Sequence, residues 1–239
     1  MQLWLCPVLA FLLGSIPFGL IIAKAKGINI REHGSGNIGA TNVLRVVGKK
    51  YGITCLLLDA LKGFIPVVIA INLVRIAGHH PQLAFEFAQP WAMELPPEKA
   101  LVGQLCHILT ALAAVLGHNY SPWVAFRGGK GVATSAGVFL ALMPVGVALL
   151  AVVWLLVFAI SRYVSVASIA AAAALPFITL YGSWSHGKIA DGTWNKPLFV
   201  FSVVIGILAI WKHRTNIQRL REGTESRFTR RKPNPAGHV

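Results

Sequence analysis

The 239-residue sequence has few charged residues, and very few of negative sign. Charged residues make up 13% of the chain, against about 25% in an average soluble domain, while hydrophobic residues make up 55% and the mean hydropathy is +0.64. This composition excludes an ordinary soluble domain and indicates a membrane protein. The 22 Lys and Arg outnumber the 8 Asp and Glu, but they lie between apolar runs, not over a solvated face. No nucleic-acid partner is therefore expected.

Cysteine is also scarce. Cys6, Cys55 and Cys106 all lie inside apolar segments and show neither the spacing of a metal site nor a pairing pattern. They are interpreted as packing residues, and the sequence predicts no metal and no other cofactor. A cleaved signal is not expected either, because the segment 3–24 is too long and lacks a small-residue cleavage site. It is taken as the first membrane helix.

Apolar stretches long enough to cross a bilayer predict an all-α polytopic membrane protein. They lie at about 3–24, 52–77, 100–117, 164–181 and 197–212. The run 132–161 would form a helix of roughly 45 Å, longer than the ~30 Å hydrocarbon core, and the break at 143–145 divides it into 132–143 and 146–161. The sequence thus predicts seven transmembrane helices in one domain, 1–228, followed by a basic and disordered tail, 229–239.

The basic residues sort between the two sides of the membrane that seven passages define. Seventeen of the 22 fall on one side. The other side receives only Arg75, Lys99, Lys188 and Lys196, which acidic residues balance. By the positive-inside rule the first side is cytoplasmic. The N-terminus is therefore expected outside and the C-terminus in the cytoplasm.

The stretch "HGSGNIGATN" at 33–42 carries Gly34, Gly36 and Gly39 in the spacing of a dinucleotide-binding fingerprint, with Asp59 20 residues after the last glycine. That fingerprint needs a preceding strand, and Asp59 falls inside a predicted membrane helix, so the nucleotide interpretation is rejected. A nest of backbone amides that binds phosphate is one alternative. Its donors would be supplemented by Ser35, Asn37, Thr41, Asn42 and Arg45. The other alternative is a tight turn that caps a short helix, with Arg45 as a membrane anchor.

A second glycine-rich segment, "GHNYSPWVAFRGGKGVAT" at 117–134, falls on the same side. Three glycines flank Lys130 at the start of a predicted helix, where unpaired amides and the helix dipole favour phosphate. It is not a nucleotide-binding P-loop, because Gly131 occupies the place of the magnesium-binding hydroxyl. The alternative is a basic turn that follows the charge asymmetry.

The third polar segment, "WKHRTNIQRLREGTESRF" at 211–228, follows the last predicted span. His213 and Asn216 are three residues apart and share a face if the last helix continues into the cytoplasm. The alternative makes His213 an interfacial residue. Three donor-rich segments on one side predict a single cytoplasm-facing site for anionic groups.

Two further patterns are assigned no catalytic role. Asp59 and Lys62, three apart in a predicted span, are interpreted as a structural ion pair that points into the bundle. "HGKIAD", from His186 to Asp191, has the H-x4-D spacing of a different class of glycerolipid acyltransferases, but it lies in a predicted outer loop, away from the three polar segments.

Together "GSGNIGATNVLR", "GHNYSPWVAFRGGKGVAT" and "HRTNIQRLREGTE" closely resemble the three motifs of bacterial acyl-phosphate:glycerol-3-phosphate acyltransferases, the PlsY family. Similarity extends to "GSIPFG", "LLLDALKG" and "RYVSVASI", and covers about 14–228. The resemblance implies transfer of an acyl group from acyl phosphate to the 1-hydroxyl of sn-glycerol 3-phosphate, forming lysophosphatidic acid and phosphate. It also implies a multi-pass enzyme of the bacterial cytoplasmic membrane whose site faces the cytoplasm, and a soluble acyl-phosphate-producing enzyme as a partner.

The resemblance implies roles for individual residues. The expected catalytic residues are Ser35, Arg45, Lys130, His213 and Asn216. The expected phosphate-binding residues are Gly34, Gly36, Asn37, Gly39, Thr41, Asn42, His118, Asn119, Gly128, Gly129 and Gly131. Glu225 matches a glutamate of the third motif with a structural role.

An acyl phosphate is already activated, so direct attack by the glycerol hydroxyl is expected, without a protein nucleophile. His213 or a substrate phosphate oxygen would take the proton. The alternative function is a transporter of a phosphorylated solute. It predicts polar residues along a pathway through the bilayer, and the predicted spans contain few.

Overall fold

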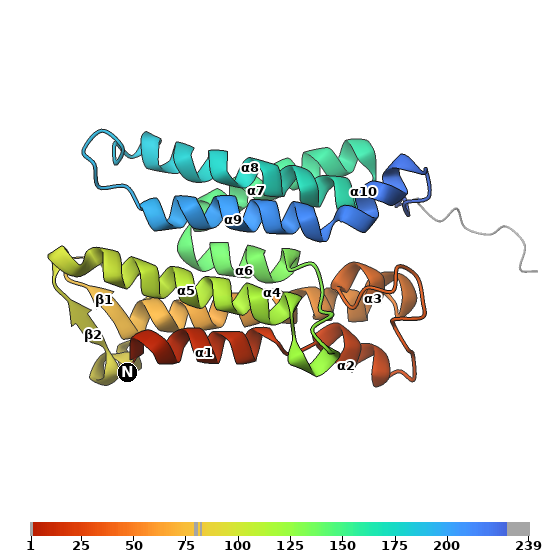
Figure 1. Cartoon of the computed structure of the whole chain (residues 1–239), viewed down its shortest axis with the longest axis horizontal. Coiled ribbons are helices and arrows are strands. Elements are labelled where there is room, and N and C mark those ends of the chain that lie inside the picture. Colours follow the sequence, from red (N-terminus) through yellow and green to blue (C-terminus); the bar gives the residue numbers. More distant parts are fainter. Residues whose placement is uncertain (1, 79–80, 82, 229–239) are drawn as a thin grey trace, which may run out of the picture.

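Residues 2–78, 81 and 83–228, the part that the computed structural model describes, are dominated by α-helices (Figure 1). The helices are α1 (Gln2–Gly14), α2 (Phe18–Lys24), α3 (Ala40–Val46), α4 (Lys49–Leu73), α5 (Ala100–Asn119), α6 (Val132–Leu142), α7 (Pro144–Ser161), α8 (Val164–Ser185), α9 (Lys196–Lys212) and α10 (Arg214–Arg221). The expected tail, 229–239, lies outside the described residues.

Helix length and composition confirm a multi-pass membrane protein. Five apolar segments of the described chain are long enough to cross a bilayer: Leu3–Lys24, Lys49–Leu73, Pro97–Val124, Pro144–Ser161 and Val164–Ser185. The pair α9 and α10, bent by 49°, makes a sixth if it is one span. Helix α6 has 11 residues, about 16 Å, which is shorter than the ~30 Å hydrocarbon core. Length alone therefore does not give the expected seven spans.

Two expected helices differ in the structure. The segment 3–24 is broken between α1 and α2, where Pro17 has no N–H to continue the helical hydrogen bonds. The segment 52–77 ends early, because the chain after α4 leaves the helix as strand β1 (Val74–Ile76), which pairs in parallel with β2 (Met93–Leu95). The chain is mostly helical, as expected, but the predicted helix over 52–77 extended too far. Short 3-10 helices, η1 (Glu86–Trp91) and η2 (Pro97–Lys99), complete this segment.

Small residues bring the helices into close contact. A Cβ on Gly137 of α6 would lie 1.9 Å from the carbonyl oxygen of Ala60 in α4, and one on Gly14 of α1 would lie 2.2 Å from that of Ala114 in α5. In Figure 1, α1, α4, α5 and α6 form one half of the bundle and α7, α8 and α9 the other. The rings of Phe139 and Phe201, 5.1 Å apart, join the halves. Such glycine-mediated contacts are typical of membrane helices.

Helix α7 is apolar and has an exposed face along its whole length. None of its residues, all of which the structure describes, is buried. Val145 and Ile160 expose 73% and 82% of their surface. Because so continuous an apolar surface is unfavourable in water, α7 is suited to contact lipid. At the end of the bundle that carries α3 and α10, opposite the strands, the three polar segments come together (Figure 1).

Candidate active site

Lys130 lies in the turn that joins α5 to α6. The turn contains residues in the left-handed region, with φ of 52° at Ala125, 60° at Phe126 and 81° at Gly131. The chain therefore reverses sharply and places Lys130 just before the N-terminus of α6. The half-buried side chain turns toward α10, where Nζ donates a hydrogen bond to Oδ1 of Asn216.

A carboxylate orients the amide that receives Lys130. Asn216 Nδ2 donates to Oε1 of Glu225 at 2.7 Å, and Ser165 Oγ of α8 donates to the same oxygen at 2.7 Å. Burial lowers the pKa of Lys130 to about 8, while the charge of Glu225 acts in the opposite direction. Lys130 is therefore mostly a cation at neutral pH. Sequence reasoning missed Ser165, whose only signal was its place in "RYVSVASI".

His213 lies at the bend between α9 and α10 and is only 3% exposed. Its Nδ1 lies 2.8 Å from the carbonyl oxygen of Ala209. A carbonyl can only accept, so Nδ1 donates and Nε2 carries the lone pair. Burial, then the charge of Lys130, lowers the pKa of His213 to about 4, and the ring is neutral at pH 7. The last helix ends at Lys212, as expected, and does not continue straight, because the chain bends here by 49°.

Arg45 connects the first polar segment to the third. It extends from α3, and Nη2 donates to the backbone oxygen of Ser226 at 3.2 Å. Its guanidinium carbon lies 5.7 Å from the ring centroid of Phe228. Arg45 and Glu225 are close enough to interact electrostatically, as are Lys130 and Arg45. Residues from all three polar segments thus belong to one cluster of charges.

The first glycine loop uses its backbone amides internally. Ser35 N donates to Oδ1 of Asn42 at 2.9 Å, Gly36 N to the oxygen of His33 at 3.1 Å, and Gly39 N to Oδ1 of Asn37 at 2.8 Å. The expectation that these amides form a phosphate nest is corrected, because each already has a partner. The alternative of a tight turn before α3 describes this backbone better.

Asn42 is a structural residue of that loop. It is 2% exposed, and its Nδ2 donates to the oxygens of Ile30 and His33 at 3.3 and 3.1 Å. Gly34, with φ of 62°, has no space for a side chain, since a Cβ would lie 2.3 Å from Asn42 Oδ1. Asn42 therefore does not present the donor that was expected of it. Ser35, Asn37 and Thr41 are half-buried at the rim of the loop.

Two amides of the second glycine loop bond within the chain. Gly128 N donates to the oxygen of Asn119, and Gly129 N to that of His118, both at 3.2 Å. These are carbonyls of the last turn of α5, which has no helical partner for them. His118 and Asn119 are 6% and 1% exposed. These two amides therefore shape the turn, and the expected phosphate contact of His118 stays a prediction.

The H-x4-D pattern forms no pair. His186 Nδ1 donates to the oxygen of Gly182 at 2.8 Å, and Asp191 accepts from the backbone of Thr193 at 2.9 Å. Both side chains are exposed. Among the residues that the structure describes, no group of three or more His, Cys, Asp or Glu could hold a metal ion.

Comparison with known proteins shows the family of the chain. The sequence model of a family described as glycerol-3-phosphate acyltransferase matches residues 4–223. The chain is 43% identical to the glycerol-3-phosphate acyltransferase of Geobacter sulfurreducens, over 92% of this chain and 94% of the relative. It is 42% identical to that of Aquifex aeolicus, over 92% and 96%.

Two solved structures are similar to this chain and are described as the same kind of enzyme. The crystal structure of PlsY, described as an integral membrane glycerol 3-phosphate acyltransferase, in its glycerol 3-phosphate form, is similar with a TM-score of 0.75 and 38% identity over 96% of each chain. The lysophosphatidic acid form has a TM-score of 0.73 at the same identity and coverage. The protein is therefore an integral membrane acyltransferase that acylates glycerol 3-phosphate, and the chain belongs to the glycerol-3-phosphate acyltransferase family of PlsY.

Proposed function

We propose that acyl phosphate is the donor, so that the products are lysophosphatidic acid and inorganic phosphate. The observation that carries this proposal is the convergence of Lys130, Arg45 and Glu225 from three separate polar segments at one end of an apolar bundle. Such a cluster suits two small phosphate groups at a membrane surface with an acyl chain beside them. The solved relatives described in a glycerol 3-phosphate form and in a lysophosphatidic acid form support the acceptor and the product.

The side chains divide between the two phosphates in this proposal. Lys130, with Gly131 at the N-terminus of α6, binds the phosphate of glycerol 3-phosphate, because a lysine cation and a helix N-terminus both favour an anion. Arg45 and Ser35 bind the phosphate of the donor, for which the planar guanidinium offers two parallel donors. Asn216 orients Lys130 through their hydrogen bond. Asn37, Thr41 and Asn119 remain proposed as phosphate-binding residues. Each either touches a phosphate or shapes the loop that does.

The reaction is a direct attack. The 1-hydroxyl oxygen bonds to the acyl carbonyl carbon, the bond from that carbon to the phosphate oxygen breaks, and the phosphate leaves with the electron pair. The hydroxyl proton passes to Nε2 of His213, which carries a lone pair, or to a phosphate oxygen of the substrate. Ser35 forms no covalent intermediate, so labelled acyl phosphate should leave no acyl group on Ser35.

The variant His213→Gln separates the two proton acceptors. If His213 is the base, turnover is lost while the Kd for glycerol 3-phosphate, measured by calorimetry, stays at the wild-type value. If a substrate phosphate is the base, substantial turnover remains. The ring of His213 is neutral and has a low pKa. It can act as a base only if the negative charge of the bound substrates raises that pKa.

Seven crossings complete the proposal, with α6 and α7 each counted as one, the N-terminus outside and the site facing the cytoplasm of a bacterial inner membrane. The native cysteines Cys6, Cys55 and Cys106 are buried, so new cysteines can be labelled selectively. Thr193→Cys should react with an impermeant maleimide in intact cells, and Thr224→Cys only after lysis. The reverse pattern would contradict the orientation.

A soluble enzyme that makes acyl phosphate is proposed as the source of the donor.

The deciding assay supplies purified protein with glycerol 3-phosphate and palmitoyl phosphate. Lysophosphatidic acid should form, and palmitoyl-CoA in place of the acyl phosphate should give none. Product from the thioester alone would overturn the proposed donor. The rival function, transport of a phosphorylated solute, predicts that sealed vesicles containing the protein accumulate labelled glycerol 3-phosphate without any donor.

A further inference from the structure

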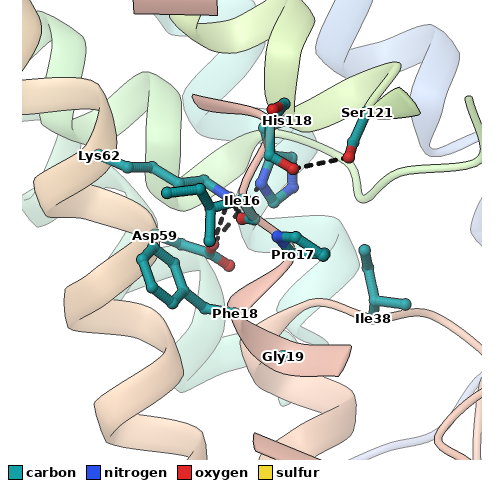
Figure 2. A pocket seen from close by; sticks show the side chains of 10 residues that line it. Ile16, Pro17, Phe18, Gly19, Ile38, Asp59, Lys62, His118 and Ser121 are labelled. Carbon is teal, nitrogen blue, oxygen red and sulfur yellow. Dashed lines mark hydrogen bonds and ion pairs between the residues drawn. The ribbon is translucent and has the colours of Figure 1, made fainter. Parts of the chain in front are cut away.

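A charged cluster is buried in the bundle next to the active site, and the proposed chemistry does not use it (Figure 2). Asp59 and Lys62 of α4 form an ion pair at 2.7 Å between Oδ1 and Nζ, which confirms the pair expected from their spacing. Their exposures are 2% and 6%. The Nδ1 of His118, at the end of α5, lies 3.7 Å from the same carboxylate oxygen. Because the cost of burying two charges can exceed their attraction, such a pair is weak evidence for added stability.

The cluster is not a ligand site. The space between its described side chains has no room for a water molecule, and Figure 2 shows the labelled side chains of Asp59, Lys62 and His118 turned toward one another. What the cluster holds must therefore be part of the chain itself.

One such part is the break between α1 and α2. Regular helical bonding stops at Pro17, and side chains from other elements reach the carbonyls of this break. Lys62 Nζ donates to the oxygen of Ile16 at 2.7 Å, and Ser121 Oγ donates to that of Ser15 at 2.6 Å. The ion pair thus fixes the broken helix to α4, and Ser121 fixes the start of the Lys130 turn to the same break.

The other part is the turn itself. His118 accepts the backbone N–H of Gly129 at its carbonyl, and its ring lies directly beneath that glycine, where a Cβ would be 2.2 Å from Nε2. A Cβ on Gly128 would lie 2.0 Å from the oxygen of His118. Such close packing means that the position of the ring determines where the glycines lie. Lys130 is the next residue.

We propose that Asp59 is a positioning residue for glycerol 3-phosphate: through His118 it fixes the glycine turn that presents Lys130, while Lys62 holds the broken helix against the same joint. The inference rests on the proposed role of Lys130. Asp59 does not touch substrate, and its effect passes entirely through the placement of the turn.

The test compares Asp59→Asn with the double variant Asp59→Asn/Lys62→Gln. The single change leaves a buried lysine without its counter-charge and can prevent folding. The double variant removes both charges and keeps similar volumes. We expect the double variant to raise KM for glycerol 3-phosphate by roughly 10- to 100-fold, because a displacement of about 1 Å can cost up to about 100-fold, with KM for acyl phosphate unchanged.

Asn72→Leu is the matched control. Asn72 is a buried polar residue on the same helix, α4, but it binds the oxygens of Val68 and Leu83 at the other end of the bundle. It should lower the melting temperature and leave KM for glycerol 3-phosphate at the wild-type value. A wild-type KM in the double variant, or an equal rise of both KM values, would overturn the proposal.

A thermodynamic cycle with Lys130→Ala shows whether the effect passes through Lys130. The Kd for glycerol 3-phosphate is measured by calorimetry in both backgrounds. We expect the double variant to weaken binding in the wild-type background and to add nothing in the Lys130→Ala background. A persistent effect there contradicts the positioning role. If Lys130→Ala itself leaves Kd unchanged, the proposed role of Lys130 is what fails.

Discussion

The affinity for glycerol 3-phosphate should fall as the pH rises above 8, and Lys130→Arg should remove this dependence. Burial lowers the pKa of Lys130 to about 8 in the free protein, so the side chain loses its proton in a range where an ordinary lysine keeps it. A bound phosphate, which is already a dianion above its pKa of about 6, favours the charged lysine and raises its pKa again. Binding above pH 8 must therefore take up a proton.

The size of the effect follows from the pKa. With a value of about 8, roughly nine-tenths of the Lys130 side chains are charged at pH 7 and roughly one-tenth at pH 9. The Kd should then rise about tenfold between these two pH values, equivalent to about 1.4 kcal/mol. Arginine stays charged throughout, so the Kd of Lys130→Arg should be flat over the same range.

Titration calorimetry in buffers of different ionisation enthalpy measures both quantities. The wild-type protein should take up close to one proton per bound ligand at pH 9 and only about one-tenth of a proton at pH 7. Lys130→Arg should take up none at either pH. A wild-type Kd that is constant from pH 7 to pH 9 would refute the reasoning. So would a tenfold loss that persists in Lys130→Arg, because another group would then be titrating.

Three further outcomes are expected. Glu225→Gln keeps a hydrogen-bond acceptor but removes the negative charge that raises the pKa of Lys130. Calorimetry should therefore find that the affinity for glycerol 3-phosphate begins to fall at a lower pH than in the wild type. An unchanged pH midpoint of that fall would contradict this. Gly129→Ala should weaken glycerol 3-phosphate binding in a folded protein, because its Cβ would meet a buried imidazole nitrogen at 2.2 Å, and wild-type affinity would argue against the tight turn. Gly137→Ala should destabilise the bundle by about 1–3 kcal/mol, seen as a lower melting temperature, because its Cβ would lie 1.9 Å from a backbone oxygen of α4. Gly182→Ala, which meets nothing within 4 Å, is the control and should melt like the wild type.

Much of the architecture could be predicted because the signals are local. A membrane helix is specified by a long apolar run, and the boundaries of α5 and α9 fall within a few residues of those expected. The break at Met143 followed from helix length against bilayer thickness. The end of α4 could not be predicted, because Val74–Ile76 becomes a strand only by pairing with Met93–Leu95, which is distant in sequence.

The site was predictable as a set of segments but not as a set of contacts. Spacing indicated Lys130 and Asn216, yet their hydrogen bond joins residues 86 apart in sequence, and Ser165 enters only through its bond to Glu225. His118 and Asn42 looked like ligands because they are polar and stand among glycines. Asn42 instead makes buried hydrogen bonds within its loop, and the ring of His118 packs against Gly129.

The sequence by itself determined that the chain lies in a membrane and where most of its apolar helices run, because hydropathy is a property of neighbouring residues; the phosphate-binding role of the three polar segments stays a prediction. Only the tertiary structure decided which amides and side chains are already satisfied and which still face the site. A donor has a partner or lacks one according to what the rest of the fold brings within about 3 Å of it, and no local pattern carries that information.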